Sequence, residues 1–311
     1  MEILKYTHLN CFQIVISSLL TDIIDYHFLW GQCGFEISIN KNKEAVATPY
    51  YFSNLEYLNL IGFKNWEIRK IIFEKADIDK IFKVLDTKKK VGILLDTSLL
   101  KYTIFFGDES HYEHLVEIET QNSIDFYIKD HFFRRILKLT KADLYSLIFA
   151  SIEYYGKTLL YHVELYKPLH FNYDIKEILK ANYDSLSSNG YSQNKIKGIK
   201  NGIPFFEEYI KKNSINYNNI DKISVEVKEF SNSRYNFFRL LRKCYSEDKN
   251  FTQVLTYLDD SSKNWLILFN LLQKQQLQRG VEDFEGRISK RFSILYEKEN
   301  YLIEEIKELI A

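Results

Sequence analysis

The sequence predicts an α+β protein in two parts, and three observations lead to this fold class. Apolar residues at steps of three and four indicate a helix over 11–29. Short β-rich segments follow one another over 91–130, and helical periodicity dominates from residue 139 onward. We therefore expect a mixed domain over 1–138 and a largely helical domain over 139–311.

The elements of the first part are expected in a definite order. After the first helix the chain becomes extended over 35–39, where apolar and polar residues alternate. Helices are expected around 65–73 and over 77–86, with Asp77 as the N-cap of the second. Strands are then expected over 91–96, 101–106, 114–120 and 123–130. A helix, a connecting region and an antiparallel meander form the element order of a papain-like cysteine-peptidase domain.

The second part is expected to be mostly helical and to begin at a helix start. Thr140 and Asp143 have the spacing of a capping box, and the helical rhythm continues over 140–165. The polar segment 185–194 predicts a loop. Further helices are expected over 174–184, 192–211, 231–245, 250–257, 261–279 and 283–309.

Composition favours a soluble globular chain and gives no electrostatic reason to expect nucleic acid or a membrane as partner. Hydrophobic residues make up 46% and charged residues 27% of the sequence. Lys and Arg total 42, and Asp and Glu also total 42, without a long block of one sign. The sequence contains no apolar run of about 18 residues, the length that a spanning helix needs.

Cysteine usage and the first residues predict a cytoplasmic protein. Cys11, Cys33 and Cys244 cannot all pair within one chain, which favours a reducing compartment. The opening MEILKYTHLN lacks the basic and apolar pattern of a signal peptide. Since the sequence has neither CxxC nor HExxH, we expect no metal and no bound cofactor.

A cysteine, a histidine and an aspartate form the candidate catalytic set. Cys11 lies where a loop runs into the first helix, whose positive end favours a thiolate. His114 begins one expected strand and Asp130 ends the next, so a hairpin brings both to the same sheet edge. His114 would act as the base and Asp130 would orient its ring.

Each of these residues taken alone is more often structural than catalytic, and other residues compete for the same roles. Buried cysteines are common in cores, and a lone histidine or strand-ending aspartate is ordinary. The joint placement of the three favours catalysis. Alternative bases are His8 and His111; Cys33 has no clear base and Cys244 is expected to be packed. Candidates for oxyanion binding or support are Asn10, Gln13 and Asp96.

Several segments of this chain resemble the butirosin biosynthesis protein H family, whose amino-terminal domain is similar to double-glycine peptidases. Asp130 follows His114 by sixteen positions, as in those peptidase domains. Lys5 replaces their oxyanion-donating Gln, and Leu100-Lys101-Tyr102 replaces the Pro-containing turn of the family. The matching segments are HLNC, LWGQCGFEI, VGILLDTSLLKY, HYEHLVEI and the downstream KD, with SNSRYNFFRLL and KNWLILFNLLQK in the helical part.

The resemblance implies an acyltransferase that forms an amide in natural-product biosynthesis. Cys11 would take an acyl group from the phosphopantetheine arm of an acyl or peptidyl carrier protein, and His114 would deprotonate an amine acceptor. The amide-forming enzyme of closthioamide biosynthesis is similar in this respect. Alternatives are a cysteine peptidase of the double-glycine-processing type, which Lys5 disfavours, and a non-catalytic binding protein on the same scaffold. A homo-oligomer is also compatible with the aromatic helical part.

Overall fold

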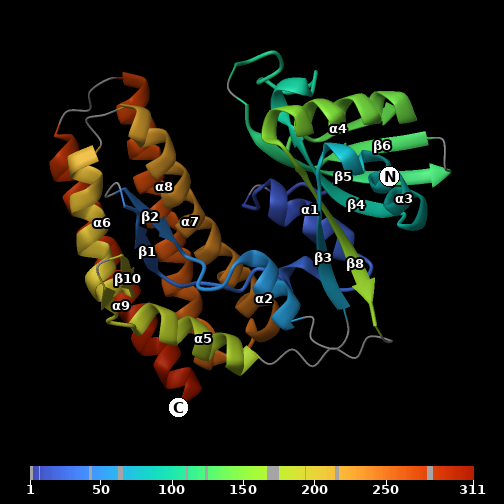
Figure 1. Cartoon of the computed structure of the whole chain (residues 1–311). Coiled ribbons are helices and arrows are strands. Elements are labelled where there is room, and N and C mark those ends of the chain that lie inside the picture. The colour runs from blue at the N-terminus through green and yellow to red at the C-terminus, as the bar shows by residue number, and fades with distance from the viewer. Residues whose placement is uncertain are drawn as a thin grey trace. The chain divides into compact units, whose positions relative to one another are not determined.

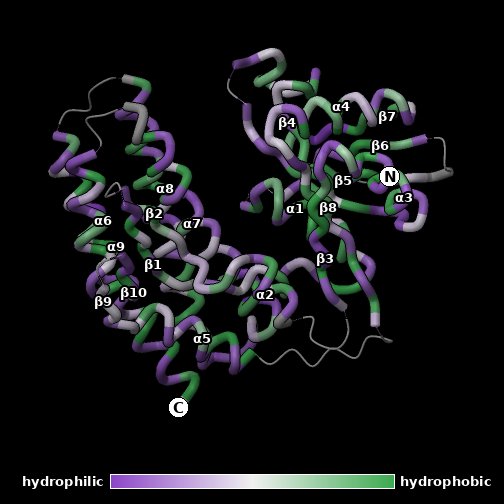
Figure 2. Tube along the Cα trace, viewed as in Figure 1, coloured by the Kyte–Doolittle hydropathy of each residue, from purple (hydrophilic) through white to green (hydrophobic). Residues whose placement is uncertain are grey.

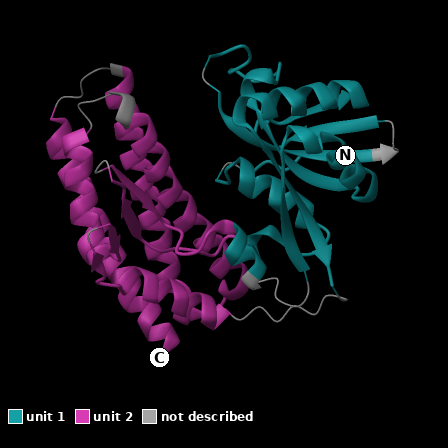
Figure 3. Ribbon diagram, in the orientation of Figure 1, with its two compact units in different colours: residues 1–29, 55–171 teal, residues 30–54, 172–311 magenta. Residues whose placement is uncertain are grey.

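The computed structural model describes residues 3–6, 8–41, 44–61, 66–109, 111–122, 125–166, 175–192, 194–213, 217–278 and 283–311. The chain forms an α+β structure that divides into two compact units (Figure 3). Unit 1 comprises Met1–Leu29 and Leu55–Phe171, and unit 2 comprises Trp30–Asn54 and Asn172–Ala311. None of the described helices is both long enough and apolar enough to cross a membrane.

Unit 1 is built on an antiparallel sheet whose strand order, within the described residues, is β3-β8-β4-β5-β6-β7 (Figure 1). Its elements are α1 (Cys11–Leu20), η1 (Tyr26–Phe28), α2 (Asn54–Ile61), which begins at the unit boundary, β3 (Trp66–Phe73), η2 (Lys75–Asp77), α3 (Ile78–Thr87), β4 (Lys90–Asp96), η3 (Thr97–Leu99), β5 (Glu113–Asn122), β6 (Asp125–Asp130), β7 (Arg135–Leu139), α4 (Lys141–Tyr155) and β8 (Thr158–Leu165).

Helices cover both faces of this sheet. Apolar side chains of β4, β5, β6 and β8 form one core with α3 and α4. Gly92 of β4 lies against Val15 of α1, whereas its neighbours Val91 and Ile93 belong to the core of α3 and α4. Because successive strand residues point to opposite faces, α1 packs on the face opposite α3 and α4 (Figure 1). The near-continuous apolar pattern of β4 follows from this burial on both sides.

The boundary between the two compact units does not lie at residue 138, where it was expected, for two reasons. The capping box of Thr140 and Asp143 is present and begins α4, but α4 packs on the sheet of unit 1. The helical rhythm expected to continue beyond it stops at Gly156, and the next residues form β8, which pairs with β3 and β4. Conversely, the segment 30–54 belongs to unit 2.

Further expectations about local structure are wrong. The helix expected over 11–29 ends at Leu20, and a strand over Lys195–Lys197 lies within the helix expected over 192–211. The helix expected around 65–73 is the strand β3, in which Trp66 and Ile68 are buried and every residue pairs with β8. Tertiary pairing outweighs local propensity here. The strand expected over 101–106 is a series of turns after η3, and the chain then reverses at Gly107 with φ +72°.

Unit 2 combines long helices with a small antiparallel sheet of order β2-β1-β10-β9 in its described part. Figure 2 shows apolar and polar segments alternating along these helices, as expected for amphipathic packing. Two helices expected over 250–279 are one continuous helix, α8. The elements are β1 (Glu36–Ile39), β2 (Ala45–Thr48), α5 (Ile175–Ser187), β9 (Tyr191–Ser192), β10 (Lys195–Lys197), α6 (Ile199–Asn213), α7 (Tyr217–Tyr245), η4 (Lys249–Phe251), α8 (Thr252–Gln278) and α9 (Phe284–Ile310).

A fully buried ion pair crosses the core of unit 2. Arg234 of α7 donates to both carboxylate oxygens of Glu299 of α9, at 2.9 and 3.0 Å, and to the carbonyl of Gly34 at 2.8 Å. Ser261 and the indole of Trp265 also donate to Glu299. These contacts satisfy the buried carboxylate with several donors and tie the segment before β1 to the helices.

Candidate active site

The N-terminus of α1 places Cys11 at the first helical position. Asn10 accepts a hydrogen bond from the Gln13 amide at 2.9 Å, and the Gln13 side chain accepts from the Asn10 amide at 3.2 Å. This capping box occupies the side-chain oxygens of Asn10 and Gln13, two of the three residues expected as oxyanion or support candidates. The thiol of Cys11 therefore lies at a rigidly capped helix start, where the helix dipole favours a negative charge.

The hairpin of β5 and β6 brings His114 and Asp130 together. His114 Nε2 lies 2.8 Å from Asp130 Oδ2, and both side chains are almost fully buried. The hydroxyl of Tyr102 donates to the same Asp130 oxygen at 3.1 Å, and the backbone amide of Phe133 donates to the other at 2.9 Å. Asp130 is thus a carboxylate held by three donors, which fixes the orientation of the His114 ring.

Cys11 and His114 are hydrogen-bonded to each other through their side chains. Since His114 Nε2 is turned to Asp130, Nδ1 is the nitrogen left for the sulfur. The backbone amides of Leu115 and Phe12 also point at Cys11 and stabilise its thiolate. The three residues named from the sequence therefore meet in unit 1 as a chain of thiol, imidazole and carboxylate.

The electrostatic surroundings of Cys11 and His114 favour a thiolate beside an imidazolium. Burial by itself raises the pKa of Cys11, but the hydrogen bond and charge of His114 outweigh burial and lower that pKa below the ordinary 9.0. Burial by itself lowers the pKa of His114, but its hydrogen bonds to Asp130 and Cys11 raise that pKa to about 9. Near neutral pH both shifts favour the charged pair, which is the reactive form of a cysteine nucleophile.

A second buried polar cluster, not anticipated from the sequence, joins α1 to the hairpin. His131, next to Asp130, faces Glu117 at 3.1 Å and accepts the Leu4 backbone amide at 3.1 Å. Glu117, three residues after His114, also takes a hydrogen bond from Ser18 of α1. Burial raises the pKa of Glu117, but the bonds from His131 and Ser18 outweigh burial and lower it. Only the alternation of charged residues in HLVEIET hinted at this cluster.

Asp96 and His111 pair with each other and are separate from the contacts of His114. Asp96 Oδ2 lies 2.5 Å from His111 Nδ1, and its other oxygen accepts the Ser98 amide at 2.8 Å. The His111 ring stacks on Tyr154 of α4, with ring centroids 3.6 Å apart. Asp96 thus orients a second histidine, and among the described residues its side-chain hydrogen bonds go to His111 and Ser98 rather than to the Cys11 site.

The remaining candidates lie in other surroundings. His8 is half-buried with its ring 6.2 Å from that of Tyr6, and Lys5 is exposed. Cys33 is fully buried in unit 2, and burial raises its pKa to about 12. Burial also raises the pKa of Cys244. Neither Cys33 nor Cys244 has the lowered thiol pKa of Cys11.

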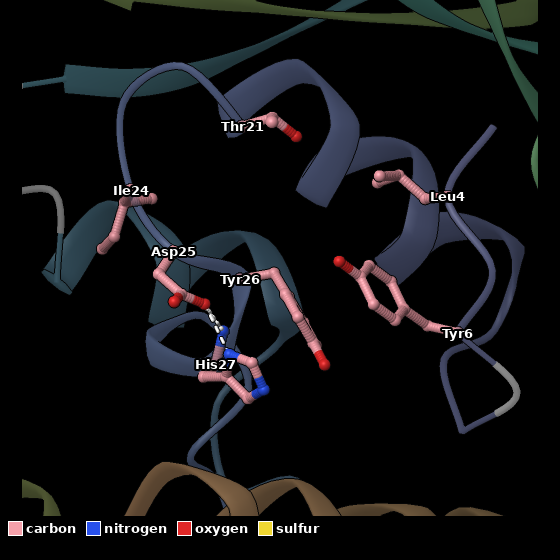
Figure 4. Close-up of a pocket in the computed structure, with 7 residues that line it drawn as sticks. All are labelled: Leu4, Tyr6, Thr21, Ile24, Asp25, Tyr26 and His27. Atoms are coloured by element: carbon pink, nitrogen blue, oxygen red, sulfur yellow. Dashed lines mark hydrogen bonds and ion pairs between the residues drawn. The ribbon is translucent and has the colours of Figure 1, made fainter. Parts of the chain in front are cut away.

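A pocket of about 450 Å³ lies in unit 1 between the N-terminal segment and the residues that follow α1 (Figure 4). Its wall includes the stacked rings of Tyr6 and Tyr26 and the hydrogen-bonded pair of Asp25 and His27. The described residues that line it are Leu4, Tyr6, Thr21, Ile24, Asp25, Tyr26 and His27, so the Cys–His–Asp chain does not contribute to this wall.

In the described part of the chain, His, Cys, Asp and Glu side chains form no group of three or more that could hold a metal ion. Comparison of the sequence with models of protein families found no match, and a search among curated proteins also found none. What the site does is therefore inferred from its own residues and contacts.

Proposed function

We propose that this protein is a cysteine-dependent acyltransferase that forms an amide bond between a carrier-bound acyl group and an amine. The observation that carries the proposal is the chain Cys11–His114–Asp130, in which the thiol pKa is lowered and the imidazole pKa is raised. A helix-capped cysteine facing a histidine on a neighbouring strand is also the arrangement of papain-like scaffolds, and we propose that unit 1 is one.

The proposed reaction has two balanced halves. The Cys11 thiolate attacks the thioester carbonyl, the new carbon–sulfur bond forms, and the departing thiol of the phosphopantetheine arm takes the proton from His114. An amine then attacks the acyl group on Cys11, neutral His114 accepts the amine proton, and the Cys11 thiolate leaves. Amide and free carrier thiol are the products, and the thiolate–imidazolium pair is restored.

Backbone amides are the proposed oxyanion donors, and the capping box of Asn10 and Gln13 fixes the helix start that carries them. A helix start leaves its first N–H groups without intrahelical acceptors, and the Cys11 amide is the first of these. Exposed Lys5 stands where double-glycine peptidases carry a Gln donor. We therefore favour transfer from an activated thioester over hydrolysis of a peptide, which depends more strongly on oxyanion stabilisation.

Intact-protein mass spectrometry tests the proposal. The protein is incubated with acyl-carrier-protein and acyl-N-acetylcysteamine thioesters, and we expect an adduct of one acyl mass that is lost in Cys11→Ala and kept in Cys33→Ala. Addition of amines should discharge the adduct as an amide. An adduct that persists in Cys11→Ala would contradict the proposal, as would cleavage of peptides without any acyl adduct.

A further inference from the structure

A continuous series of aromatic rings runs from His114 to the surface of unit 1. The rings of Phe132 and Phe133 lie 5.8 and 5.2 Å from the ring of His114. Phe133 also contacts Phe105 at 6.4 Å, and Phe105 contacts Tyr112 at 5.2 Å. One end of the series therefore touches the base that holds Cys11, and the other end lies on the loop before β5.

Much of this series and its flanks is exposed. Phe132 is 49% and Tyr112 is 52% exposed, and Ile104 and Phe106, which flank Phe105 in the chain, are 86% and 52% exposed. Single exposed apolar residues are ordinary, but a contiguous apolar surface usually marks a binding site. We call these residues, with Phe105 and Phe133, the aromatic patch.

The backbone holds the patch in place by defined contacts. Asp130 accepts the amide of Phe133, and the following Arg134 adopts φ 57°, so the turn that presents the two phenylalanines is tight. On the other side, the Thr97 amide donates to the Tyr112 carbonyl at 3.0 Å. Such ordered presentation lowers the entropic cost of binding a ligand.

We propose that the aromatic patch binds the acyl chain carried on Cys11, and that the enzyme accepts uncharged apolar acyl groups, aromatic or linear, in preference to charged ones. This inference rests on the proposed function. The occupant is inferred from contact: His114 touches both the nucleophile and the patch, so a single imidazole ring separates Cys11 from the aromatic rings that an acyl chain on its sulfur would reach.

The charges around the patch support an uncharged ligand. The described loops that carry it, together with the first residues of β5 and β7, expose three cations and three anions, so they offer no excess of one sign to a charged acyl chain. The exposed charged residues are Lys101, Asp108, Glu109, Glu113, Arg134 and Arg135.

Alkylation of Cys11 tests the patch without requiring acyl transfer. Neutral chloroacetamides with N-benzyl, N-hexyl or N-hydroxyethyl groups share one electrophile and differ only in the chain presented to the patch. We expect the benzyl and hexyl reagents to modify Cys11 roughly tenfold faster than the hydroxyethyl reagent, after division by their rates with free cysteine. Rates are measured by peptide mass spectrometry, so that Cys33 and Cys244 are scored separately.

Variants connect the selectivity to the patch. Phe132→Ala and Tyr112→Ala should each lower the apolar-to-polar rate ratio several-fold, whereas Tyr191→Ala, an aromatic of 72% exposure in unit 2, should leave it unchanged. Equal rates in the wild type, or a ratio that neither patch variant moves, would overturn the inference. A dimer in sedimentation equilibrium that Phe132→Ala dissociates would also overturn it, by assigning the surface to a second copy.

The two proposals fail separately. If no thioester acylates Cys11 but the alkylation ratio persists, the acyltransferase is rejected and the apolar site beside a reactive cysteine stands. If thioesters acylate Cys11 without preference among acyl chains and the alkylation ratio is one, the patch is rejected and the transferase stands.

Discussion

Cys11 in unit 1 and Cys33 in unit 2 are the same residue type, but their thiol pKa values are shifted in opposite directions. Both sulfurs lie near a cation that is itself held by a carboxylate: His114 with Asp130, and Arg234 with Glu299. Yet the pKa of Cys11 is lowered, whereas burial raises the pKa of Cys33 to about 12.

The two pKa shifts differ because the two cations donate their hydrogen bonds to different acceptors. Arg234 gives hydrogen bonds to Glu299, to Ser233 and to the Gly34 carbonyl, while the charge of Glu299 opposes ionisation of Cys33. His114 has one nitrogen on Asp130 and donates from the other to the sulfur itself. A direct hydrogen bond, rather than a nearby charge, distinguishes the thiol whose pKa is lowered from the thiol whose pKa is raised.

The largest contrast is expected in thiol reactivity. At pH 7, iodoacetamide should modify Cys11 more than about 100-fold faster than Cys33, because a thiol pKa near 12 leaves about one thiolate in 10⁵. Peptide-resolved mass spectrometry measures both rates in one sample. Comparable slow labelling of the two cysteines would remove the distinction and, with it, the candidate active site.

The second largest effect is expected on turnover, when the Asp130 carboxylate that pairs with His114 is replaced. In Asp130→Asn we expect acyl transfer to fall by about 10²–10⁴-fold with little change in substrate binding. Without the carboxylate, the His114 pKa falls from about 9 toward its ordinary 6.5, and the Cys11 pKa rises. The ion pair exists only between these two pKa values, so it is populated over a narrower pH range.

The pH dependence of Cys11 alkylation reports this change directly. The wild-type rate should be lost as the pH falls through the lowered Cys11 pKa, and in Asp130→Asn this loss should begin at higher pH. Asp96→Asn is the matched control, since Asp96 serves His111 instead. Identical alkylation profiles in wild type and Asp130→Asn would show that the carboxylate does not act through His114.

In unit 2, replacement of the Glu299 carboxylate that pairs with Arg234 should affect the stability of the fold. Glu299→Gln leaves the Arg234 guanidinium buried without its counter-charge, so the free energy of unfolding should fall by about 3–5 kcal/mol. Urea denaturation followed by circular dichroism measures the loss. The control Glu208→Gln breaks the exposed pair with Lys212 and should have no measurable effect. Equal stability of both variants would mean that Arg234 finds other partners.

Much of the fold could be predicted because its signals are local. The start of α1, the strands β4, β5 and β6 and the capping box of α4 follow from apolar periodicity and turn or cap residues. β3 and β8 were expected to be helical, since their strand character depends on pairing with partners nearly a hundred residues away. Sequence periodicity cannot report such pairing.

The candidate site likewise contains residues that the sequence could predict and residues whose roles it could not. Cys11, His114 and Asp130 could be named because a helix start and a hairpin fix their relative places in the fold. The roles of Gln13 and Asp96 could not, because a capping hydrogen bond and the pairing with His111 depend on side-chain orientation. The buried His131–Glu117 contact was missed for the same reason.

The smallest expected effect concerns the third donor to Asp130. Tyr102→Phe removes a neutral hydroxyl from the carboxylate oxygen that also faces His114, and retains the ring. One neutral hydrogen bond contributes about 0.5–1.5 kcal/mol, so turnover should fall less than about tenfold, and the alkylation profile of Cys11 should move only slightly. Tyr154→Phe, which keeps the ring stacked on His111, is the control. A loss in Tyr102→Phe as large as that in Asp130→Asn would mean that the hydroxyl, rather than the Phe133 amide and His114, holds the carboxylate in its catalytic orientation.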